Sequence, residues 1–218
     1  MTSWPVLASL DEEEVVRVLG AGRRRRFQRG EVLFHHGDPG DSFHLVDVGR
    51  VMVRVLSPRG DQVILSVIGP GGSFGELALV DGHGHRTATV TAIQTCETIS
   101  LHKTQFEQLR TARPELDRFL VASLAQQVAQ LSEQLLEVLF LSTKLRVVRQ
   151  LLVLGDEFDG VIPLTQEEIG LMSGTTRPTV NETLREIERT GAIRIGRGRI
   201  EVLDRARLTS RLARARGT

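Results

Sequence analysis

Two short motifs near the middle of the chain combine groups that can bind a small sugar phosphate. The first is Phe74-Gly75-Glu76-Leu77-Ala78-Leu79, and after six residues the second is Arg86-Thr87-Ala88-Thr89-Val90. Gly75 has no Cβ and lets the backbone approach a ligand, while Glu76 can accept hydrogen bonds from ribose hydroxyls. Arg86 can hold a phosphate through two parallel charge-assisted hydrogen bonds. The alternative interpretation is a tight turn with a structural ion pair between Arg86 and Glu76.

The residues just after Gly75 support the first interpretation. The segment from Glu76 to Leu79 is short enough to form one helical turn, and its free N–H groups would face an anion. We therefore expect Gly75, Leu77 and Ala78 to contribute backbone to the site.

Length and composition describe a soluble chain of two small domains. It has 218 residues, of which 40% are hydrophobic, and no apolar run approaches the ~18 residues of a membrane span. The acidic residues 11–14 argue against a secretion signal, so we expect a cytoplasmic protein without a membrane segment. The single cysteine, Cys96, excludes an internal disulfide and a four-cysteine iron–sulfur site. We expect it to be a buried thiol.

The net charge of +1 hides an asymmetry between the two parts of the chain. Residues 1–142 hold 14 Lys and Arg against 17 Asp and Glu, whereas residues 143–218 hold 14 against 10. A basic C-terminal region is compatible with a polyanionic partner. The run Arg23 to Arg26 is interpreted as a solvated segment leading into the first strand, with a nucleic-acid contact as the alternative.

From Phe27 to Leu101 the pattern predicts an antiparallel β-roll. Before it, Ser9 and Glu12 are expected to form the capping box of a short helix ending near Leu19. The β-region has short apolar segments separated by Gly and Asp turns, namely Val32–Phe34, Phe43–Val46, Val51–Val55 and Val63–Ile68. The histidine pairs lie in turn regions without the further ligands that zinc needs, so we expect no metal site.

The segment 114–140 predicts a long helix with a narrow apolar stripe. The stripe alternates spacings of four and three, as in a coiled-coil seam, and consists of Leu124, Val128, Leu131, Leu135 and Val138. It predicts a parallel dimer helix ending in a hinge near 141–143. The alternative is one amphipathic helix packed on its own β-domain.

The C-terminal segment predicts a winged helix. A helix over 144–154 and an acidic loop over 156–160 come first. Thr165 and Glu168 then form a second capping box, Gly174 ends that helix, and another runs from about 177 to 190. Two strands around Gly196-Arg197-Gly198 complete a basic hairpin. Helix, glycine turn and helix have the spacing of a DNA-binding helix-turn-helix.

In this order, β-roll, long helix and winged helix, the chain resembles the cyclic-AMP receptor protein and FNR superfamily of bacterial transcription regulators. The resemblance implies an α+β fold with a β-roll domain over 1–113, a dimerisation helix and hinge over 114–142, and a winged-helix DNA-binding domain over 143–218. It also implies a homodimer gated by cyclic AMP or cyclic GMP, with double-stranded DNA as partner, RNA polymerase as a candidate partner, and no catalytic residues.

The resemblance assigns roles to individual residues of the effector site. Glu76 would bind the ribose 2′-hydroxyl, and Arg86 with Thr87 the cyclic phosphate. In relatives a Thr-Ser pair of the dimer helix meets adenine, and the matching positions are Leu131 and Ser132. Since Leu131 cannot hydrogen-bond an amine, the phosphate and sugar half of the site is intact and the base-reading half is altered.

The recognition helix departs from its relatives as well. Arg177 matches an arginine that reads guanine, but Pro178 replaces a base-reading glutamate, and Glu182 replaces an arginine and could accept from cytosine N4. Proline is tolerated in the first helical turn. The remaining candidates for DNA contact are Thr165, Thr175, Thr176, Thr179, Asn181, Arg197 and Arg199.

Three other functions stay open at this point. A nucleotide-binding module that regulates a partner protein would leave the basic winged helix unexplained. A nucleotide-processing enzyme would need a metal cluster or a base dyad. A regulator of the same fold could bind DNA without a nucleotide or respond to another small effector.

Overall fold

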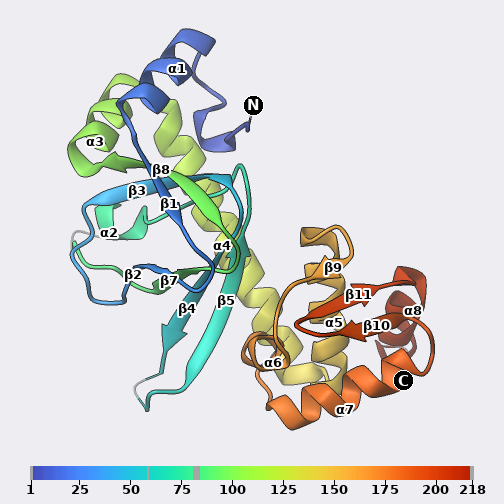
Figure 1. The fold of residues 1–218 in the computed structure, drawn as a ribbon. Helices are drawn as coiled ribbons and strands as arrows, with labels where there is room; N and C mark the ends of the chain where they lie inside the picture. The colour runs from blue at the N-terminus through green and yellow to red at the C-terminus, as the bar shows by residue number, and fades with distance from the viewer. Residues whose placement is uncertain (1, 58, 81–83, 217–218) are drawn as a thin grey trace. The chain divides into compact units, whose positions relative to one another are not determined.

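Two four-stranded antiparallel sheets form the centre of the first part of the chain (Figure 1). The structure is a computed structural model and describes residues 2–57, 59–80 and 84–216. One sheet has the order β1-β8-β3-β6 and the other β2-β7-β4-β5. Their strands are β1 Arg23–Phe27, β2 Val32–Phe34, β3 Ser42–Val48, β4 Val51–Leu56, β5 Gln62–Ile68, β6 Ser73–Phe74, β7 Thr89–Ala92 and β8 Cys96–His102.

Alternation along β3 divides the hydrophobic core of this unit into two clusters. Phe43 and Leu45 pack against the flanking helices, whereas Val46 packs into a cluster with Phe27 and Phe74. Successive side chains of a strand point to opposite faces, which accounts for this division. The flanking helices are η1 Pro5–Leu7, α1 Glu12–Ala21, the single turn α2 Leu77–Val80, α3 Lys103–Ala112 and the start of α4 Glu115–Phe140.

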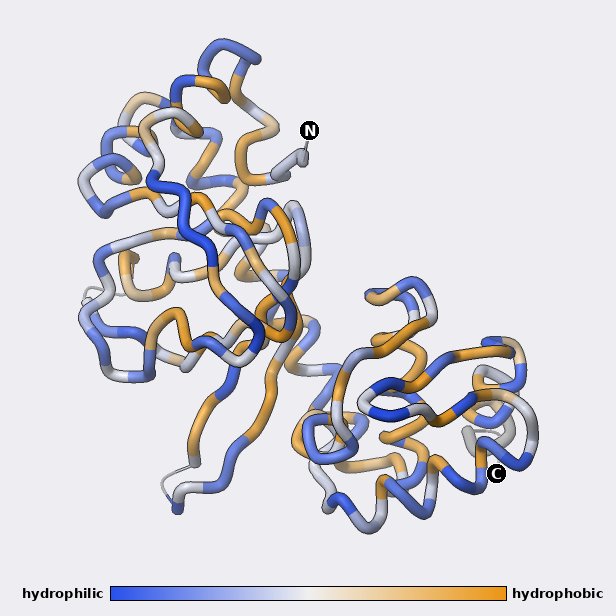
Figure 2. Tube along the Cα trace, viewed as in Figure 1, coloured by the Kyte–Doolittle hydropathy of each residue, from blue (hydrophilic) through white to orange (hydrophobic). Residues whose placement is uncertain are grey.

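Two local predictions in this region are wrong. The capping box of α1 is formed by Asp11 and Glu14, not by Ser9 and Glu12, because the Asp11 carboxylate accepts from the Glu14 N–H at 2.8 Å. The run Arg23 to Arg26 does not lead into the first strand but is that strand, β1, paired with β8. Figure 2 shows most of β1 as a hydrophilic stretch.

Exposed ion pairs make an arginine strand tolerable at the edge of its sheet. Arg24 Nη1 lies 2.7 Å from Asp47 Oδ2, and Arg26 Nε lies 3.8 Å from Glu97 Oε1. Charged side chains on an edge strand also discourage pairing with another chain. Cys96 is buried as expected, and burial raises the pKa of its thiol to about 11.

The second part of the chain is a winged helix. Its elements are α5 Thr143–Glu157, β9 Val161–Ile162, α6 Gln166–Ser173, α7 Arg177–Glu188, β10 Ile193–Gly196, β11 Arg199–Val202 and α8 Arg205–Arg216. The three strands form an antiparallel sheet with the order β10-β11-β9. Val180, Leu184 and Ile187 of α7 are buried, as the sequence pattern predicts.

In this part of the chain, one sequence prediction is wrong and one helix was not predicted. The acidic residues Asp156 and Glu157 belong to the last turn of α5 rather than to a loop, because the apolar face of the helix continues to Leu154 and Phe158. Helix α8 was not predicted, and it buries Leu208 and Leu212.

The chain divides into two compact units, Met1–Ala129 and Gln130–Thr218. The boundary lies within α4, whose first turns bury Leu116 and Leu120 in the core of the first unit. The α+β fold expected from the sequence is confirmed, while the separate domain 114–142 stays a prediction. No helix in the described ranges is long and apolar enough to cross a membrane.

Candidate effector site and nucleic-acid interface

The guanidinium of Arg86 is the centre of a buried cradle in the first unit. Its side chain is 3% exposed. Nη1 donates to the carbonyl oxygens of Ser42 at 2.7 Å and of Gly75 at 3.2 Å, and Nη2 donates to Ser42 Oγ at 2.7 Å. The ring of Phe34 covers it, with its centroid 4.1 Å from the guanidinium carbon. Neutral groups therefore hold this cation in a fixed position.

The cradle leaves the positive charge without a strong counterion. Among the described residues, the ion-pair partner of Arg86 is Asp41, at 3.9 Å, and Arg86 Nε is buried without any hydrogen-bond partner. Removal from water lowers the pKa of the guanidinium below its usual value, and Asp41 counters this only in part. A buried donor without a partner costs roughly 1–3 kcal/mol. An oxyanion at Nε would remove that cost.

Gly75 is required by the geometry of the cradle. Its φ of 91° lies in the left-handed region, and a Cβ there would come within 2.7 Å of Arg86 Nη1 and 3.0 Å of the Ser42 carbonyl oxygen. Any side chain at position 75 would thus displace the arginine.

Glu76 lies beside the cradle and is bound by the long helix. Its carboxylate is buried, and Gln127 Nε2 of α4 donates to Glu76 Oε1 at 3.4 Å. Burial raises the pKa of this carboxyl above its usual value. The backbone carbonyl of Glu76 accepts from the N–H groups of Leu79 and Val80, which closes the turn α2. This carboxylate accepts from Gln127 and from its own backbone N–H, and its two oxygens retain capacity to accept from ligand hydroxyls.

In the second unit, two helices and a turn place a basic surface next to the wing. Thr165 caps α6 and completes the capping box with Glu168, as the sequence predicts. Gly174 ends α6 with φ 60°, and α7 begins at Arg177. A Cβ at Gly170 would meet the Thr175 carbonyl oxygen at 2.8 Å, so the tight turn requires glycine there as well.

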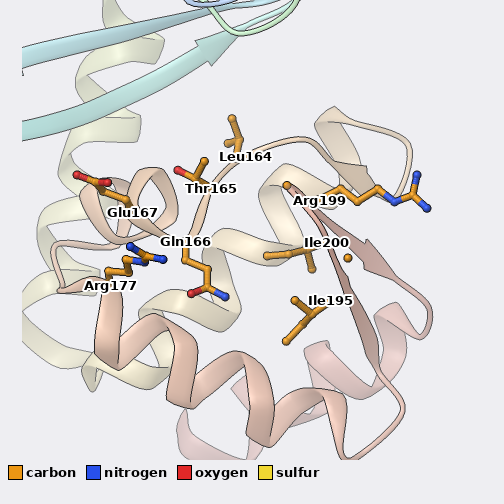
Figure 3. A pocket seen from close by; sticks show the side chains of 10 residues that line it. Leu164, Thr165, Gln166, Glu167, Arg177, Ile195, Arg199 and Ile200 are labelled. Atoms are coloured by element: carbon orange, nitrogen blue, oxygen red, sulfur yellow. The ribbon is translucent and has the colours of Figure 1, made fainter.

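A pocket of about 330 Å³ lies between the start of α6, the start of α7 and the wing (Figure 3). Arg177 lines it from α7, Gln166 and Glu167 from α6, and Arg199 from β11. Figure 3 shows Gln166 directed toward α7. This surface carries cations and amide groups at the N-terminus of a recognition helix, which is where such helices contact base edges and phosphates.

Arg146 of α5 connects two helix ends within the second unit. Its Nε donates to the Ser173 carbonyl at 2.9 Å and its Nη2 to the Gly174 carbonyl at 3.1 Å. Nη1 donates to the Leu141 carbonyl at 3.2 Å and the Val138 carbonyl at 3.4 Å. The last carbonyls of a helix have no partner within it, so one guanidinium caps both the end of α4 and the end of α6.

Both units match known families. Residues 24–113 match the model of the cyclic nucleotide-binding domain, and residues 145–211 match the Crp-like helix-turn-helix domain. The Cyclic AMP receptor protein of Thermus thermophilus is 31% identical over 211 residues, which cover 95% of this chain and 96% of that protein. The chain belongs to the CRP/FNR family of transcription regulators.

Other family members are similarly close. The CRP-like cAMP-activated global transcriptional regulator of Mycobacterium tuberculosis is 32% identical over 193 residues, covering 85% of this chain and 86% of that one. The crystal structure of a CRP/FNR-family transcriptional regulator from Thermus thermophilus superposes with a TM-score of 0.72 at 28% identity, covering 88% of this chain and 98% of that one. The family and the fold predicted from the sequence are therefore confirmed.

The structure brings together part of the predicted effector site of this CRP/FNR regulator. Gly75, Glu76 and Arg86 lie in one cradle, with Ala78 buried and Leu77 half-buried in the adjoining turn. Thr87 follows Arg86 and is exposed. The alternative of a direct ion pair between Arg86 and Glu76 is not what the cradle shows, since carbonyl groups hold Arg86 and Gln127 holds Glu76. Sequence reasoning missed Ser42, Phe34 and Gln127, since only the fold brings them to the motif.

Leu131 and Ser132 lie on the part of α4 that belongs to the second unit. Leu131 is 48% exposed, and Val128, Leu135 and Val138 of the same stripe are also exposed in the single chain. Their contact with a base and with a second subunit stays a prediction. Within the described ranges, no group of three or more His, Cys, Asp or Glu is placed to hold a metal ion.

The predicted DNA-binding residues of the regulator lie in different environments. Arg177, Arg197 and Arg199 are exposed. Thr176 Oγ1 and Thr179 Oγ1 lie 3.2 Å apart, and Thr165 serves as the cap of α6. Pro178 is in the first turn of α7. Further candidates also have partners within the chain. Lys144 Nζ donates to Glu182 Oε1 at 2.7 Å, Asn181 Oδ1 accepts from Arg185 Nε at 3.3 Å, and Arg199 Nη2 lies 3.6 Å from Glu201 Oε1.

Proposed function

We propose that this CRP/FNR protein is a cytoplasmic, homodimeric, sequence-specific DNA-binding regulator gated by a cyclic nucleotide, with cyclic AMP as the first candidate. The observation that carries the proposal is the buried Arg86 guanidinium, whose Nε has no partner among the described residues. A cyclic phosphate supplies an oxyanion that would accept from this N–H and balance the buried charge. The named relatives from Thermus thermophilus and Mycobacterium tuberculosis are cyclic AMP proteins by description, which supports the same effector class.

The residues of the cradle divide the ligand between them. Arg86 would hold the phosphate, as a donor that is already fixed by Ser42 and Gly75. Glu76 would accept from the ribose 2′-hydroxyl, in exchange for its weak bond from Gln127 at 3.4 Å. Because Gln127 belongs to α4, ligand binding at Glu76 would directly remove a hydrogen bond made by that helix.

The apolar stripe of α4 supports a homodimer. Val128, Leu135 and Val138 are 63%, 59% and 54% exposed in the single chain. They lie on one face of the helix at a/d spacing, which is the pattern of a two-stranded seam. A second copy of α4 would bury this stripe and place two recognition helices on successive major grooves, about 34 Å apart.

Gating requires that the nucleotide bind one arrangement of the dimer better than another. The α4 helix carries Gln127 near its middle, and its last carbonyls are bound by Arg146 of α5. A change at Glu76 can therefore reach the helix-turn-helix through one helix and one guanidinium. We propose no chemical step on the nucleotide, and RNA polymerase remains a predicted partner only.

Cyclic GMP is the second candidate effector, because Leu131 replaces the hydroxyl that would meet the adenine amine. Isothermal titration calorimetry with cyclic AMP, cyclic GMP and cyclic di-GMP tests the effector directly. We expect cyclic AMP to bind, with cyclic GMP within about tenfold, since one net hydrogen bond contributes only about 0.5–1.5 kcal/mol. Leu131→Thr should raise the affinity for cyclic AMP relative to cyclic GMP.

Three outcomes would contradict parts of this proposal. Heat changes absent for all three nucleotides would mean that the regulator binds DNA without a nucleotide or responds to another small effector. An unchanged ratio of the two affinities in Leu131→Thr would show that Leu131 does not face the base. Sedimentation of the chain as a monomer at micromolar concentration would contradict the dimer.

A further inference from the structure

The recognition helix α7 carries a polar stripe that contains two predicted DNA-binding residues and Arg185, which the sequence analysis did not name. Arg177, Asn181 and Arg185 follow each other at intervals of four, so they share one side of the helix. Arg185 Nε donates to Asn181 Oδ1 at 3.3 Å, and Gln166 Nε2 of α6 donates to the same oxygen at 3.5 Å.

The orientation of the Asn181 amide follows from its neighbour. A guanidinium has only donors, so the Asn181 atom that faces Arg185 must be the carbonyl oxygen and not the nitrogen. That oxygen is occupied twice, and the amide NH₂ group of Asn181 is left to point elsewhere. Asn181 is thereby converted from a group that both donates and accepts into one that chiefly donates.

The carboxylates of α7 are occupied in a similar way. Lys144 Nζ donates to Glu182 Oε1 and to Glu186 Oε1, and Arg211 Nη2 donates to Glu186 Oε2 at 3.0 Å. Glu188 Oε1 accepts from the N–H of Ile195 at 2.8 Å. Each carboxylate or amide side chain of α7 thus has an oxygen bound by a donor of its own chain.

We infer that the recognition helix presents mainly hydrogen-bond donors to the major groove and therefore selects acceptor edges. A G·C pair offers two adjacent acceptors there, guanine N7 and O6, whereas an A·T pair places the adenine N6 amine between the acceptors adenine N7 and thymine O4. The usual bidentate contact of asparagine with adenine needs a free carbonyl oxygen for the N6 amine, which Asn181 does not have. Its NH₂ group should accordingly read the acceptors of guanine.

This inference rests on the proposed function, because a duplex must bind along α7 for the stripe to read it. The alternative is a purely structural role, in which Asn181 and Arg185 form an ordinary pair at i and i+4 spacing. Such a pair would contribute slightly to helix stability and nothing to base preference.

A selection from a library of duplexes with a randomised centre separates these possibilities. The full chain is used, with cyclic AMP, with cyclic GMP and without nucleotide, and the bound duplexes are sequenced. The base pair read by Asn181 is the one whose preference disappears in Asn181→Ala. In the parent we expect a G·C pair there, favoured over an A·T pair by about fivefold or more.

A double variant, Gln166→Ala with Arg185→Ala, gives the sharpest test. Removing both donors frees the Asn181 oxygen, so adenine should rise at that base pair and become the preferred base. The control Arg205→Ala changes a surface arginine of α8 that pairs with Asp156, and its base preferences should match the parent. Circular dichroism verifies that each variant is folded.

The outcomes are distinct. An A·T pair preferred by the parent at that position would overturn the inference, as would a G·C preference that persists in the double variant, or preferences unaltered in Asn181→Ala. Enrichment of no duplex under any of the three conditions would instead overturn the proposed function, and the inference with it.

Discussion

The effector cradle and the recognition helix both depend on arginine, but they satisfy it in opposite ways. Arg86 is buried, held by neutral carbonyl and hydroxyl groups, and keeps one N–H without a partner. On α7, Arg177 and Arg185 are exposed, and the neighbouring oxygens of Asn181 and Glu182 are bound by Arg185 and Lys144. The cradle thus lacks a hydrogen-bond acceptor for Arg86 Nε, whereas on α7 oxygens of Asn181 and Glu182 already accept hydrogen bonds from the chain itself.

This difference indicates how each region gains selectivity. In the cradle, water is excluded and the charge interaction is strong, so a single anionic ligand can decide the state of the unit. On α7 each contact is solvated and weak. Selectivity for a DNA sequence therefore comes from several donors acting together and from side-chain oxygens that are already hydrogen-bonded within the chain. Substitutions should therefore have large effects in the cradle and moderate effects on the helix.

Arg86→Ala should have the largest effect, with a loss of roughly 3–5 kcal/mol in nucleotide binding, because a buried phosphate would lose its charge partner. Calorimetric titration measures this directly. Arg24→Ala, which changes an exposed arginine of the same unit paired with Asp47, is the matched control and should bind like the parent. Retained affinity in Arg86→Ala would mean that the cradle is not the effector site.

Arg146→Ala tests how much this arginine contributes to the stability of the second unit. It removes four hydrogen bonds from a charged donor to the ends of α4 and α6. We expect the free energy of unfolding of the second unit to fall by about 1.5–3 kcal/mol, measured by urea denaturation. The exposed pair of Arg194 with Glu201 is the control, and Arg194→Ala should cost less than about 1 kcal/mol. Equal losses in both variants would argue against the double cap.

His44 makes the stability of the cradle depend on pH. Its ring stacks on Phe74, with centroids 5.0 Å apart, and its Nε2 lies 3.2 Å from the Ser42 hydroxyl that binds Arg86. Burial and the charges of Arg86 and Arg25, opposed by Asp41, lower the pKa of His44 to about 3. Below pH 6.5 the unfolded chain binds a proton that the folded chain does not bind, so stability falls as the pH falls.

The expected slope is up to about 1.4 kcal/mol per pH unit, or about 2 kcal/mol between pH 6.5 and 5. Denaturation curves over this range should show that His44→Gln removes most of the slope, whereas His36→Gln at an exposed position leaves it in place. A parallel decline of parent and His44→Gln would show that His44 is protonated in the folded state.

The smaller effects belong to the DNA surface. Arg177→Ala should cost about 1–3 kcal/mol in operator binding and relax the preference for guanine at one base pair of each half-site. Arg197→Ala, in the turn of the wing, should weaken binding to all sequences alike and reduce the salt dependence by about one ion. Mobility shifts over a salt series measure both. If Arg177→Ala weakened all base variants equally, direct readout by Arg177 would be rejected.

The local parts of this structure could be read from the sequence, because their signals lie within a few residues. Examples are the capping box of Thr165 and Glu168, Gly174 at the end of α6, and the two motifs that contain Gly75 and Arg86. The acidic end of α5 was misread as a loop, because the composition of Asp156 and Glu157 does not show that Phe158 beyond them is buried.

The remaining contacts could not be predicted because they join distant residues. Gln127 meets Glu76 across 51 positions, and Lys144 meets Glu182 across 38. Neither pair leaves a periodic or motif signal in the sequence, in which Glu182 is a candidate for DNA contact. Only the packing of α5 against α7 reveals its lysine partner.

Nucleotide-gated DNA binding is tested most directly by fluorescence anisotropy with a labelled operator duplex taken from the selection. The affinity of the parent should rise by about 5- to 150-fold when cyclic AMP is saturating, and Arg86→Ala should retain the low affinity at every nucleotide concentration. The same operator affinity for the parent with and without cyclic AMP and cyclic GMP would contradict the account.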